Sequence, residues 1–534
     1  MQAGNSEANE LARQRLLVES LAAASRRALP SGDVQLIETH ISFVLLAGEH
    51  ACKIKKALDL GFLDFSTLDK RRFFCEEELR LNRRLAPQLY LEVAPIGGTP
   101  EAPRLGEAPA IEYAVKMARF PQERLADAVL ARGELGAAAI NALAAAVAAF
   151  HDSIPRARAQ DPFGDARAIA EPAEQNFTQI RALLEEGEDA DRLDFLEAWN
   201  GAAQRRLEPL FAARKRDGFI RECHGDLHLG NIVLFGDAPF IFDCIEFNPN
   251  LRWIDVMNEA AFLVMDLQAR GRPDLASRFL SGYLEAGGDY LGLGLLAYYK
   301  AYRAMVRAKV ARIRAAQQGL AAEQKDEALT EYRRYLGEAA RAATAGAPAL
   351  ILTHGYSASG KSHFAALAVE RLGAVRIRSD VERKRLHGLG ALQPSDSPLA
   401  GGIYRQQSTE ETYRRLAQLA RHTLQAGLPA VVDAAFLKRW QRDRLRALAG
   451  ELGVPCLIAD CRAPEALLRQ RLADRLRAGG DASEATSAVL DSQLREAEAP
   501  AADEAAGVVA VDCAGGDIRP ALEEIGRRLR MGAA

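Results

Sequence analysis

The sequence predicts two domains of different fold class, an α+β domain followed by an α/β domain built on a parallel sheet. At 534 residues the chain is longer than one hydrophobic core usually supports. Residues 34–117 show short β-prone runs, polar turns and one helical stretch, and helical patterns follow to about Arg341. Beyond residue 348, apolar runs alternate with helical stretches, the pattern of parallel strands with crossover helices.

The composition is that of a globular protein. Hydrophobic residues make up 49% and charged residues 26%, which argues against a disordered or fibrous chain. A formal net charge of −3 provides no global field that would attract nucleic acid or an acidic membrane. The 7 cysteines form no CxxC pair, so neither a zinc site nor a disulfide framework is expected. The N-terminus lacks the features of a signal or transit peptide, and we expect a cytoplasmic protein.

Strands and helices of the first domain follow from hydrophobic spacing. Residues 34–56 predict antiparallel strands, and further strands are expected at Pro95–Ile96 and at residues 111–117. Between them, Lys70–Leu85 has apolar residues at helical spacing. The Ala-rich stretch Leu135–Phe150 is too short to span a bilayer and predicts a packed interior helix.

Three segments are predicted along the chain. An amphipathic N-terminal helix covers residues 1–30, the first domain residues 31–345 and the second domain residues 346–534. The second boundary is placed at Ala339–Pro348, a low-complexity connector with two chain breakers near its end. Strands of the second domain are predicted at residues 349–353, 374–378, 430–432, 456–459 and 508–511.

The first candidate catalytic site lies around a short hairpin pattern. His224-Gly225-Asp226 is followed by Asn231, and Asp243 ends an apolar strand-like run. Phosphoryl transfer needs a carboxylate that orients the attacking hydroxyl and oxygen ligands for magnesium. The order and the Asp-x4-Asn spacing match a kinase catalytic loop followed by its metal-binding aspartate. A single carboxylate more often caps a loop, but this ordered set favours a kinase.

These motifs resemble the signature of the aminoglycoside phosphotransferase and choline kinase-like family, His-Gly-Asp-x-His-x-x-Asn followed by an Ile-Asp strand. The resemblance covers roughly the first two-thirds of the chain. It implies a protein-kinase-like α+β fold in which Asp226 is the catalytic base. It also implies that Asn231 and Asp243 bind magnesium.

The same resemblance implies a nucleotide site in the small sheet-rich lobe. A strand lysine, either Lys53 or Lys55, would hold the phosphates, and a helix glutamate, either Glu78 or Glu77, would pair with it. Both lysines lie on one strand face, so the sequence leaves this choice open. Met117 would contact the adenine.

One departure from the family concerns the loop that covers the phosphates. Glu38–Ser42 stands where the resemblance implies a Gly-rich loop, and only Gly48 follows in the next turn. His151 and His228 are expected to be packing residues, because a lone histidine is more often structural than a ligand.

The second candidate site is a phosphate-binding loop. The segment from Gly355 to Ser362 satisfies the Gly-x4-Gly-Lys-Ser (Walker A) pattern, between an apolar strand and a helix that stops at Gly373. Backbone N–H groups of such a loop wrap a phosphate, the lysine bridges phosphates and the serine hydroxyl binds magnesium. The predicted nucleotide-binding residues are Gly355, Ser357, Ala358, Ser359, Gly360, Lys361 and Ser362, with Ser362 also a metal ligand.

Two carboxylates end strands of the same domain. Carboxylates at the carboxyl ends of parallel strands face the ligand crevice. Asp433 is therefore predicted to hold the magnesium water shell, and Asp380 to orient or deprotonate an acceptor hydroxyl. The alternative for each is a helix N-cap.

Two arginines complete the second site. Arg471 and Arg475 are one helical turn apart, as in a lid whose cations stabilise a transferring phosphoryl group; a solvated basic face is the alternative. With Arg378-Ser379-Asp380 and Val432-Asp433-Ala434, the region resembles the gluconate kinase, chloramphenicol phosphotransferase, zeta toxin and polynucleotide kinase group. That resemblance implies an α/β P-loop NTPase fold.

Together these patterns predict a bifunctional ATP-dependent kinase that uses ATP and Mg²⁺. Each site would transfer the γ-phosphate to a hydroxyl of an unidentified small-molecule acceptor. One alternative is a nucleotide-gated regulatory protein, favoured by the missing Gly-rich loop. Another is phosphorylation of nucleic-acid 5′-ends by the P-loop domain, against which the absent net positive charge counts. The cations that could track phosphates there are Arg376, Arg378, Arg383, Lys384 and Arg385.

Overall fold

The protein is described from a computed structural model. The described residues are 2–29, 33–61, 63–184, 189–317, 319–344, 346–398, 401–478 and 482–531. They form two compact units, one of Met1–Ala142, Phe150–Ile169 and Phe211–Glu259, the other of Leu143–Ala149, Ala170–Leu210 and Ala260–Ala534. The predicted segment boundaries at residues 30–31 and 345 lie outside the described residues, so the division at these points stays a prediction.

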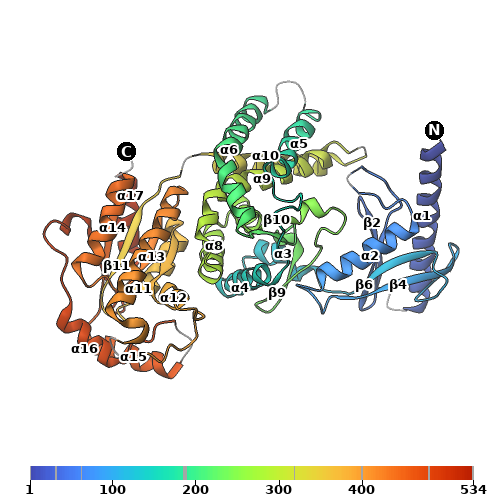
Figure 1. The fold of residues 1–534 in the computed structure, drawn as a ribbon. Coiled ribbons are helices and arrows are strands. Elements are labelled where there is room, and N and C mark those ends of the chain that lie inside the picture. Colours follow the sequence, from blue (N-terminus) through green and yellow to red (C-terminus); the bar gives the residue numbers. More distant parts are fainter. Residues whose placement is uncertain are drawn as a thin grey trace. The chain divides into compact units, whose positions relative to one another are not determined.

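An antiparallel sheet dominates the start of the first unit, as predicted (Figure 1). Its strand order is β1-β2-β3-β6-β4-β5. The strands are β1 (Val34–Glu38), β2 (Ser42–Ala47), β3 (His50–Lys55), β4 (Tyr90–Thr99), β5 (Ala102–Leu105) and β6 (Glu112–Ala118). Helix α1 (Gln2–Ala28) buries Leu17, Val18 and Leu21 against Phe43 and Ile54 of this sheet, which forms a local hydrophobic core.

Helix α2 (Leu68–Asn82) corresponds to the helix predicted over residues 70–85. It begins after Thr67, whose side-chain oxygen accepts a hydrogen bond from the Lys70 N–H, because such a cap satisfies an N–H group that the first turn leaves unpaired. The helix buries Cys75 and Glu78 on the side facing the sheet, so that a carboxylate is held at the strand lysines.

Short strands position the first catalytic motif. In the first unit, β7 (Ile220–Glu222) pairs with β10 (Trp253–Asp255), and β8 (Ile232–Phe235) forms a hairpin with β9 (Ala238–Ile241). The 3₁₀ turn η2 (Leu229–Asn231) leads into β8. The hairpin returns the chain, so that the segments before β8 and after β9 meet.

Helices dominate the chain from about residue 122 to residue 343. They are η1 (Gln122–Arg124), α3 (Ala126–Ala131), α4 (Ala137–Ser153), α5 (Ala166–Arg181), α6 (Ala190–Arg216), η3 (Pro249–Leu251), α7 (Val256–Ala269), α8 (Pro273–Gly287), η4 (Tyr290–Gly292), α9 (Leu293–Ala315) and α10 (Ala322–Ala343). Among the described helices, none has both the length and the apolar character needed to cross a membrane.

The predicted connector is partly helical. Helix α10 continues to Ala343, so the first residues of Ala339–Pro348 are not a linker. Alanine and arginine are among the strongest helix formers, and Ala339 and Ala342 are buried, which explains why the helix runs on. The expectation of a low-complexity connector over this whole stretch was therefore wrong.

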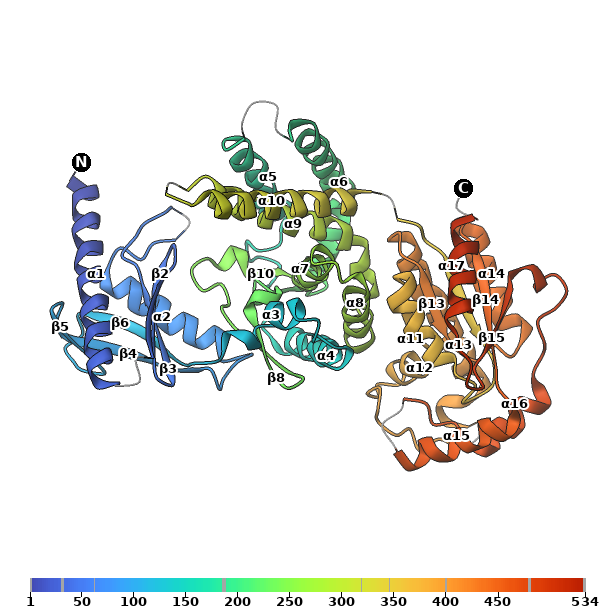
Figure 2. The ribbon, with the colours of Figure 1, turned by 180° about the vertical axis from the view of Figure 1, so that it is seen from behind.

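The second unit contains the predicted parallel sheet, with strand order β12-β13-β11-β14-β15 (Figure 2). The strands are β11 (Leu350–His354), β12 (Val375–Arg378), β13 (Ala430–Asp433), β14 (Cys456–Arg462) and β15 (Val508–Asp512). All four neighbouring pairs are parallel. The P-loop NTPase-like α/β architecture predicted for this region is thus confirmed.

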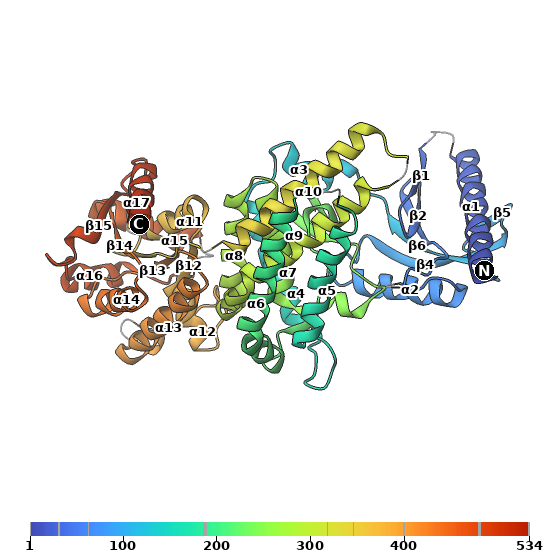
Figure 3. The same cartoon turned by 90° about the horizontal axis from the view of Figure 1, so that it is seen from above.

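Helices cover both faces of this sheet (Figure 3). The helices and 3₁₀ turns of this region are α11 (Lys361–Leu372), α12 (Ser379–Leu386), η5 (Gly402–Tyr404), α13 (Gln406–Gln425), α14 (Arg439–Leu452), α15 (Glu465–Ala478), α16 (Ser487–Glu496), η6 (Ala505–Gly507) and α17 (Arg519–Met531). Phe364 of α11 and Ile525 of α17 pack against Ile351, Val431 and Val511 on one face. Helices α13 and α14 lie on the other face.

Candidate active sites

Both strand lysines of the first unit contact Glu78. The Lys53 ammonium lies 2.9 Å from Glu78 and 2.6 Å from Asp243, and Lys55 lies 2.7 Å from the other Glu78 oxygen. Lys55 is fully buried and also pairs with Glu246. Glu77 instead forms a 2.6 Å ion pair with Arg80 at the surface of α2. The structure therefore places Glu78, and not Glu77, beside the lysines, and Lys53 beside Asp243.

Charge within this cluster is unbalanced. Two lysines face three carboxylates, those of Glu78, Asp243 and Glu246. Burial opposes ionisation of Glu78, but its ion pairs with Lys53 and Lys55 outweigh this and lower its pKa. Burial raises the pKa of Glu246. The surplus carboxylate, together with the half-exposed Asp243 side chain, fits a site that accepts a further cation.

Loss of Lys55 is expected to destabilise the first unit more than loss of Lys53. Lys55→Met leaves the buried Glu246 without its counter-ion, while Glu78 keeps Lys53, and breaking a buried pair costs about 3–5 kcal/mol. Lys53→Met leaves Glu78 paired with Lys55. Denaturant unfolding of both variants checks the order, and equal midpoints would contradict it.

The predicted base Asp226 lies beside Asn231. The Asn231 side-chain amide donates to the Asp226 carboxylate at 2.9 Å and to its backbone carbonyl at 3.0 Å. The Asp226 side chain is about one third exposed, so a substrate hydroxyl can reach it. His228 caps the η2 turn by accepting from the Gly230 N–H, and its other ring nitrogen lies 3.3 Å from Asp226. His228 thus has the packing role predicted and an additional contact with Asp226.

Asp243 follows the hairpin in a left-handed backbone conformation, with φ of +64°. For a residue other than glycine this conformation is strained, and such strain clusters at functional sites. Hydrogen bonds hold it in place: the Phe242 N–H donates to the Asn231 carbonyl at 3.0 Å, and the Asp243 N–H donates to the Tyr90 hydroxyl at 3.2 Å. The two predicted metal ligands are therefore tied to each other through the backbone.

Sequence reasoning missed two supports of this site. Glu246 balances Lys55, and nothing in its local sequence distinguishes it from a surface glutamate. Glu259 accepts from the Gly225 N–H at 2.6 Å and pairs with His151 at 2.7 Å, which fixes the backbone next to the predicted base Asp226. His151 thus has the structural role predicted. Both contacts join segments more than 30 residues apart, which spacing arguments cannot detect.

The turn where a Gly-rich loop was expected contains no glycine. Residues 39–41 join β1 to β2, and the Thr39 hydroxyl donates to the Ser42 carbonyl at 3.0 Å. The Lys56 ammonium forms a 2.8 Å ion pair with the carboxylate of Glu38, the residue that precedes the turn. Met117, the predicted adenine contact, stands near the end of β6 opposite Ala51 of β3.

The predicted phosphate-binding loop of the second unit joins β11 to α11, so it lies between a strand and a helix as expected. Gly355 has φ of +140° and Gly360 has φ of +102°, which favours glycine at both positions. A Cβ at Gly360 would lie 2.9 Å from the Cys513 sulfur and one at Gly355 2.5 Å from the Cys461 carbonyl oxygen. The loop backbone therefore packs too closely for side chains at these glycines.

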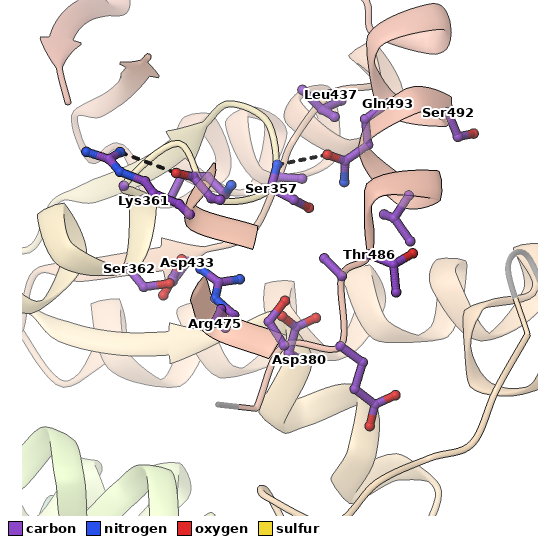
Figure 4. A pocket seen from close by; sticks show the side chains of 18 of the residues that line it. Ser357, Lys361, Ser362, Asp380, Asp433, Leu437, Arg475, Thr486, Ser492 and Gln493 are labelled. Carbon is purple, nitrogen blue, oxygen red and sulfur yellow. Dashed lines mark hydrogen bonds between the residues drawn. The ribbon is translucent and has the colours of Figure 1, made fainter. Parts of the chain in front are cut away.

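Lys361, Ser362 and Asp433 lie at one pocket (Figure 4). The Lys361 amine donates to the Tyr356 carbonyl at 2.6 Å, across the loop. Burial lowers the pKa of Lys361, while Asp433 counteracts this. Among the described residues, one Asp433 carboxylate oxygen is buried without a hydrogen-bond partner. An orphaned carboxylate oxygen beside a serine hydroxyl fits a magnesium site.

Asp380 and Asp433 are not helix N-caps. Arg378 occupies the N-cap position of α12, with Asp380 inside the first turn, and no helix starts directly after Asp433. Burial raises the pKa of Asp380, although Arg383 and Arg378 oppose the shift. A half-buried carboxylate with a raised pKa that lines a pocket is typical of a catalytic acid or base.

The two arginines of α15 make different contacts. Arg471 donates to the Cys513 carbonyl at 2.7 Å and to the Ala358 carbonyl at 3.4 Å, so it ties the helix to the phosphate-binding loop. Arg471 and Arg475 both line the pocket. Figure 4 shows Arg475 on the same side as Asp433 and Asp380.

The pocket has a volume of about 870 Å³, which lies in the usual range of small-molecule and cofactor sites. Figure 4 shows Ser362 and Asp433 on one side and Thr486, Ser492 and Gln493 on the other. The Gln493 side chain accepts from the Ser357 N–H at 2.8 Å. Sequence reasoning did not find Gln493, because α16 carries no motif and reaches the loop only in the folded chain.

Comparison with known proteins supports two kinase-like regions. Residues 72–296 match the phosphotransferase enzyme family, and residues 350–500 match an AAA domain family. The predicted likeness of the first region to aminoglycoside phosphotransferases and of the second to P-loop proteins is thereby confirmed. Together the matches support a phosphotransferase enzyme.

A relative covers nearly the whole chain. A Mycobacterium tuberculosis protein, Uncharacterized protein Rv2004c, is 32% identical over 458 residues, which are 86% of this chain and 89% of the relative. The Mycobacterium bovis protein Mb2027c matches to the same extent.

Solved structures align with each region separately. The amicoumacin kinase hAmiN, in complex with AMP-PNP, Ca²⁺ and Ami, aligns at 12% identity and a TM-score of 0.38, over 58% of this chain and 89% of that one. A gluconokinase from Sinorhizobium meliloti aligns at 24% identity and a TM-score of 0.24, over 35% and 93%.

Proposed function

The chain belongs to the family of these mycobacterial proteins, and we propose that it is an ATP-dependent kinase with two separate nucleotide sites. Each site transfers the γ-phosphate of ATP to a hydroxyl group of a small molecule. The observation that carries the proposal is the convergence of Lys361, Ser362, Asp380 and Asp433 on one pocket. These are the charges and ligands that phosphoryl transfer needs.

In the P-loop site, the loop N–H groups and the start of α11 bind the phosphates, and Lys361 provides the positive charge. Ser362 and Asp433 would hold Mg²⁺, which neutralises phosphate charge when bound. Asp380 accepts the proton of the acceptor hydroxyl. Arg475 stabilises the charge on the transferring group, and Arg471 keeps α15 against the loop.

In the first site, Asp226 orients the acceptor hydroxyl and takes its proton. Asn231 holds the Asp226 carboxylate in place, and Asn231 and Asp243 would hold Mg²⁺. Lys53 contacts the nucleotide phosphates, whereas Lys55 is a buried counter-ion of Glu78 and Glu246. Without glycines in the turn between β1 and β2, we expect weaker phosphate cover than in the P-loop site.

The acceptors are small molecules rather than nucleic acid. Of the cations that could track a phosphate backbone, Arg376 and Arg378 pair with Glu285, and Lys384 pairs with Glu484 at 3.0 Å. Arg383 is buried, with its guanidinium against the Tyr404 ring. Because these cations are paired or buried within the protein, they leave little exposed positive charge that could bind a polyanion.

The experiment that tests the function offers labelled ATP and a fractionated metabolite extract to the full chain. Wild type, Lys361→Ala, Asp226→Asn and the double variant are compared. We expect each single variant to lose a different labelled product and the double variant to lose both. Nucleotide binding without transfer to any acceptor would support the regulatory alternative instead.

Activity of the P-loop site is expected to rise with pH as Asp380 loses its proton. Because burial raises the pKa of Asp380, this rise lies above the pH range of an ordinary aspartate. The carboxylate must be ionised to accept the hydroxyl proton, so turnover increases through that pKa. A pH profile of kcat/KM in an Asp226→Asn background measures the rise. The residual activity of Asp380→Asn should not rise with pH in this way. If it does, a group other than Asp380 causes the rise.

A further inference from the structure

Within the second unit, helix α8 covers the edge strand of the parallel sheet. Strand β12 stands at the end of the strand order, where backbone groups lack a neighbouring strand. The Arg376 N–H donates to the Ser281 hydroxyl of α8 at 3.1 Å, and the Tyr290 hydroxyl donates to the Arg376 carbonyl at 3.2 Å. Residues 281 and 290 belong to the stretch that matches the phosphotransferase family. Side chains of that stretch thus complete the edge of the sheet.

Glu285 of α8 binds both arginines of β12. One oxygen lies 2.8 Å from Arg376 and the other 3.1 Å from Arg378. All three side chains are about four-fifths buried. Because charge interactions strengthen where water is excluded, Glu285 holds the Arg378 guanidinium firmly.

The other edge of Arg378 faces the candidate metal ligand. Its Nε atom lies 3.9 Å from the Asp433 oxygen that has no hydrogen-bond partner among the described residues. At that distance the two side chains form a long ion pair, which is too long for a hydrogen bond. A small movement of the guanidinium would turn it into a hydrogen-bonded pair that occupies this Asp433 oxygen. Arginine pairs readily with carboxylates, so it would compete with a metal ion for this oxygen.

We propose that Glu285 is a positioning residue of the P-loop site, which holds Arg378 back from Asp433 and so keeps that carboxylate available to magnesium. This inference rests on the proposed function. It makes a helix of the phosphotransferase-like region part of the P-loop site. Removal of the Glu285 charge would leave Asp433 as a strong partner for Arg378, and magnesium would bind less tightly.

The test is a magnesium titration of the full chain, read as binding of a fluorescent ATP analogue with the first site silenced by Asp243→Asn. In Glu285→Gln, we expect the magnesium concentration for half-maximal binding to rise by about 10- to 100-fold, the usual effect of disturbing a group that orients a metal ligand. Affinity for the nucleotide without magnesium should stay unchanged, which a general loss of structure would not produce.

Glu370→Gln is the matched control. Glu370 of α11 has a side chain as buried as that of Glu285 and pairs at 2.6 Å with a different arginine of α8, Arg278. This variant breaks an ion pair to the same helix and should keep the wild-type magnesium dependence. Equal shifts in the two variants would overturn the inference.

Arg378→Gln gives a second, independent check, also if Glu285→Gln does not fold. With the competing cation removed, the magnesium requirement should not rise, and adding Glu285→Gln should change nothing further. A rise in Arg378→Gln alone, or a shift by Glu285→Gln in that background, would overturn the inference. If Lys361→Ala binds the ATP analogue as tightly as wild type does, the proposed function itself fails. If Lys361→Ala weakens binding but Glu285→Gln does not change the magnesium requirement, only the inference is refuted.

Discussion

Replacing Lys361 with alanine is expected to weaken nucleotide binding at the P-loop site by at least about tenfold, since hydrogen bonds to charged groups contribute about 1.5–3 kcal/mol. Lys361 is the first residue of α11, next to the left-handed Gly360, and its amine reaches back across the loop to the Tyr356 carbonyl. A bound phosphate would take the place of that carbonyl as its partner. Without the amine, the loop N–H groups alone face the phosphate charge.

The measurement is ATP binding by calorimetry on the full chain with the first site silenced by Asp243→Asn. The full chain is needed because α8 covers the edge of β12, and an isolated P-loop region would lack these contacts. Arg371→Ala is the control: it removes a cation from the other end of α11, at an exposed position. Undiminished affinity in Lys361→Ala would show that the loop is not a phosphate cradle.

Asp226→Asn is expected to lower phosphoryl transfer at the first site by about 10²- to 10⁴-fold, the usual contribution of a positioned base. The asparagine keeps the shape of Asp226 but cannot take the proton of the acceptor hydroxyl. Nucleotide affinity should change little, because the Lys53–Asp243 pair is untouched.

Asp243→Asn should behave differently and weaken magnesium-dependent nucleotide binding itself. Both variants are measured with the P-loop site silenced by Lys361→Ala. Asp237→Asn, an exposed aspartate in the turn between β8 and β9, is the control and should match wild type. Equal turnover of wild type and Asp226→Asn would mean that the first site is not a kinase of this design.

Local signals allowed much of both sites to be predicted. The segment from Gly355 to Ser362 is contiguous, and a loop between a strand and a helix needs its glycines for backbone reasons that the sequence itself carries. The spacing of Asp226, Asn231 and Asp243 likewise reflects one short hairpin. The predicted lid arginines are one helical turn apart in the structure too, but only their contacts separate Arg471, bound to the loop, from Arg475.

The sequence by itself determined the two fold classes, the parallel sheet and the order of the chemical groups, because hydrophobic periodicity and short motifs depend on neighbouring residues. Only the tertiary structure decided that Glu78 rather than Glu77 meets the lysines, and that Lys55 is a buried counter-ion of Glu246. It alone brought Glu285 to Arg378, across 93 residues of chain. Such pairs form because a buried charge without a partner destabilises the fold. Tertiary packing, and not position along the chain, decides which oppositely charged residue lies close enough to pair with it.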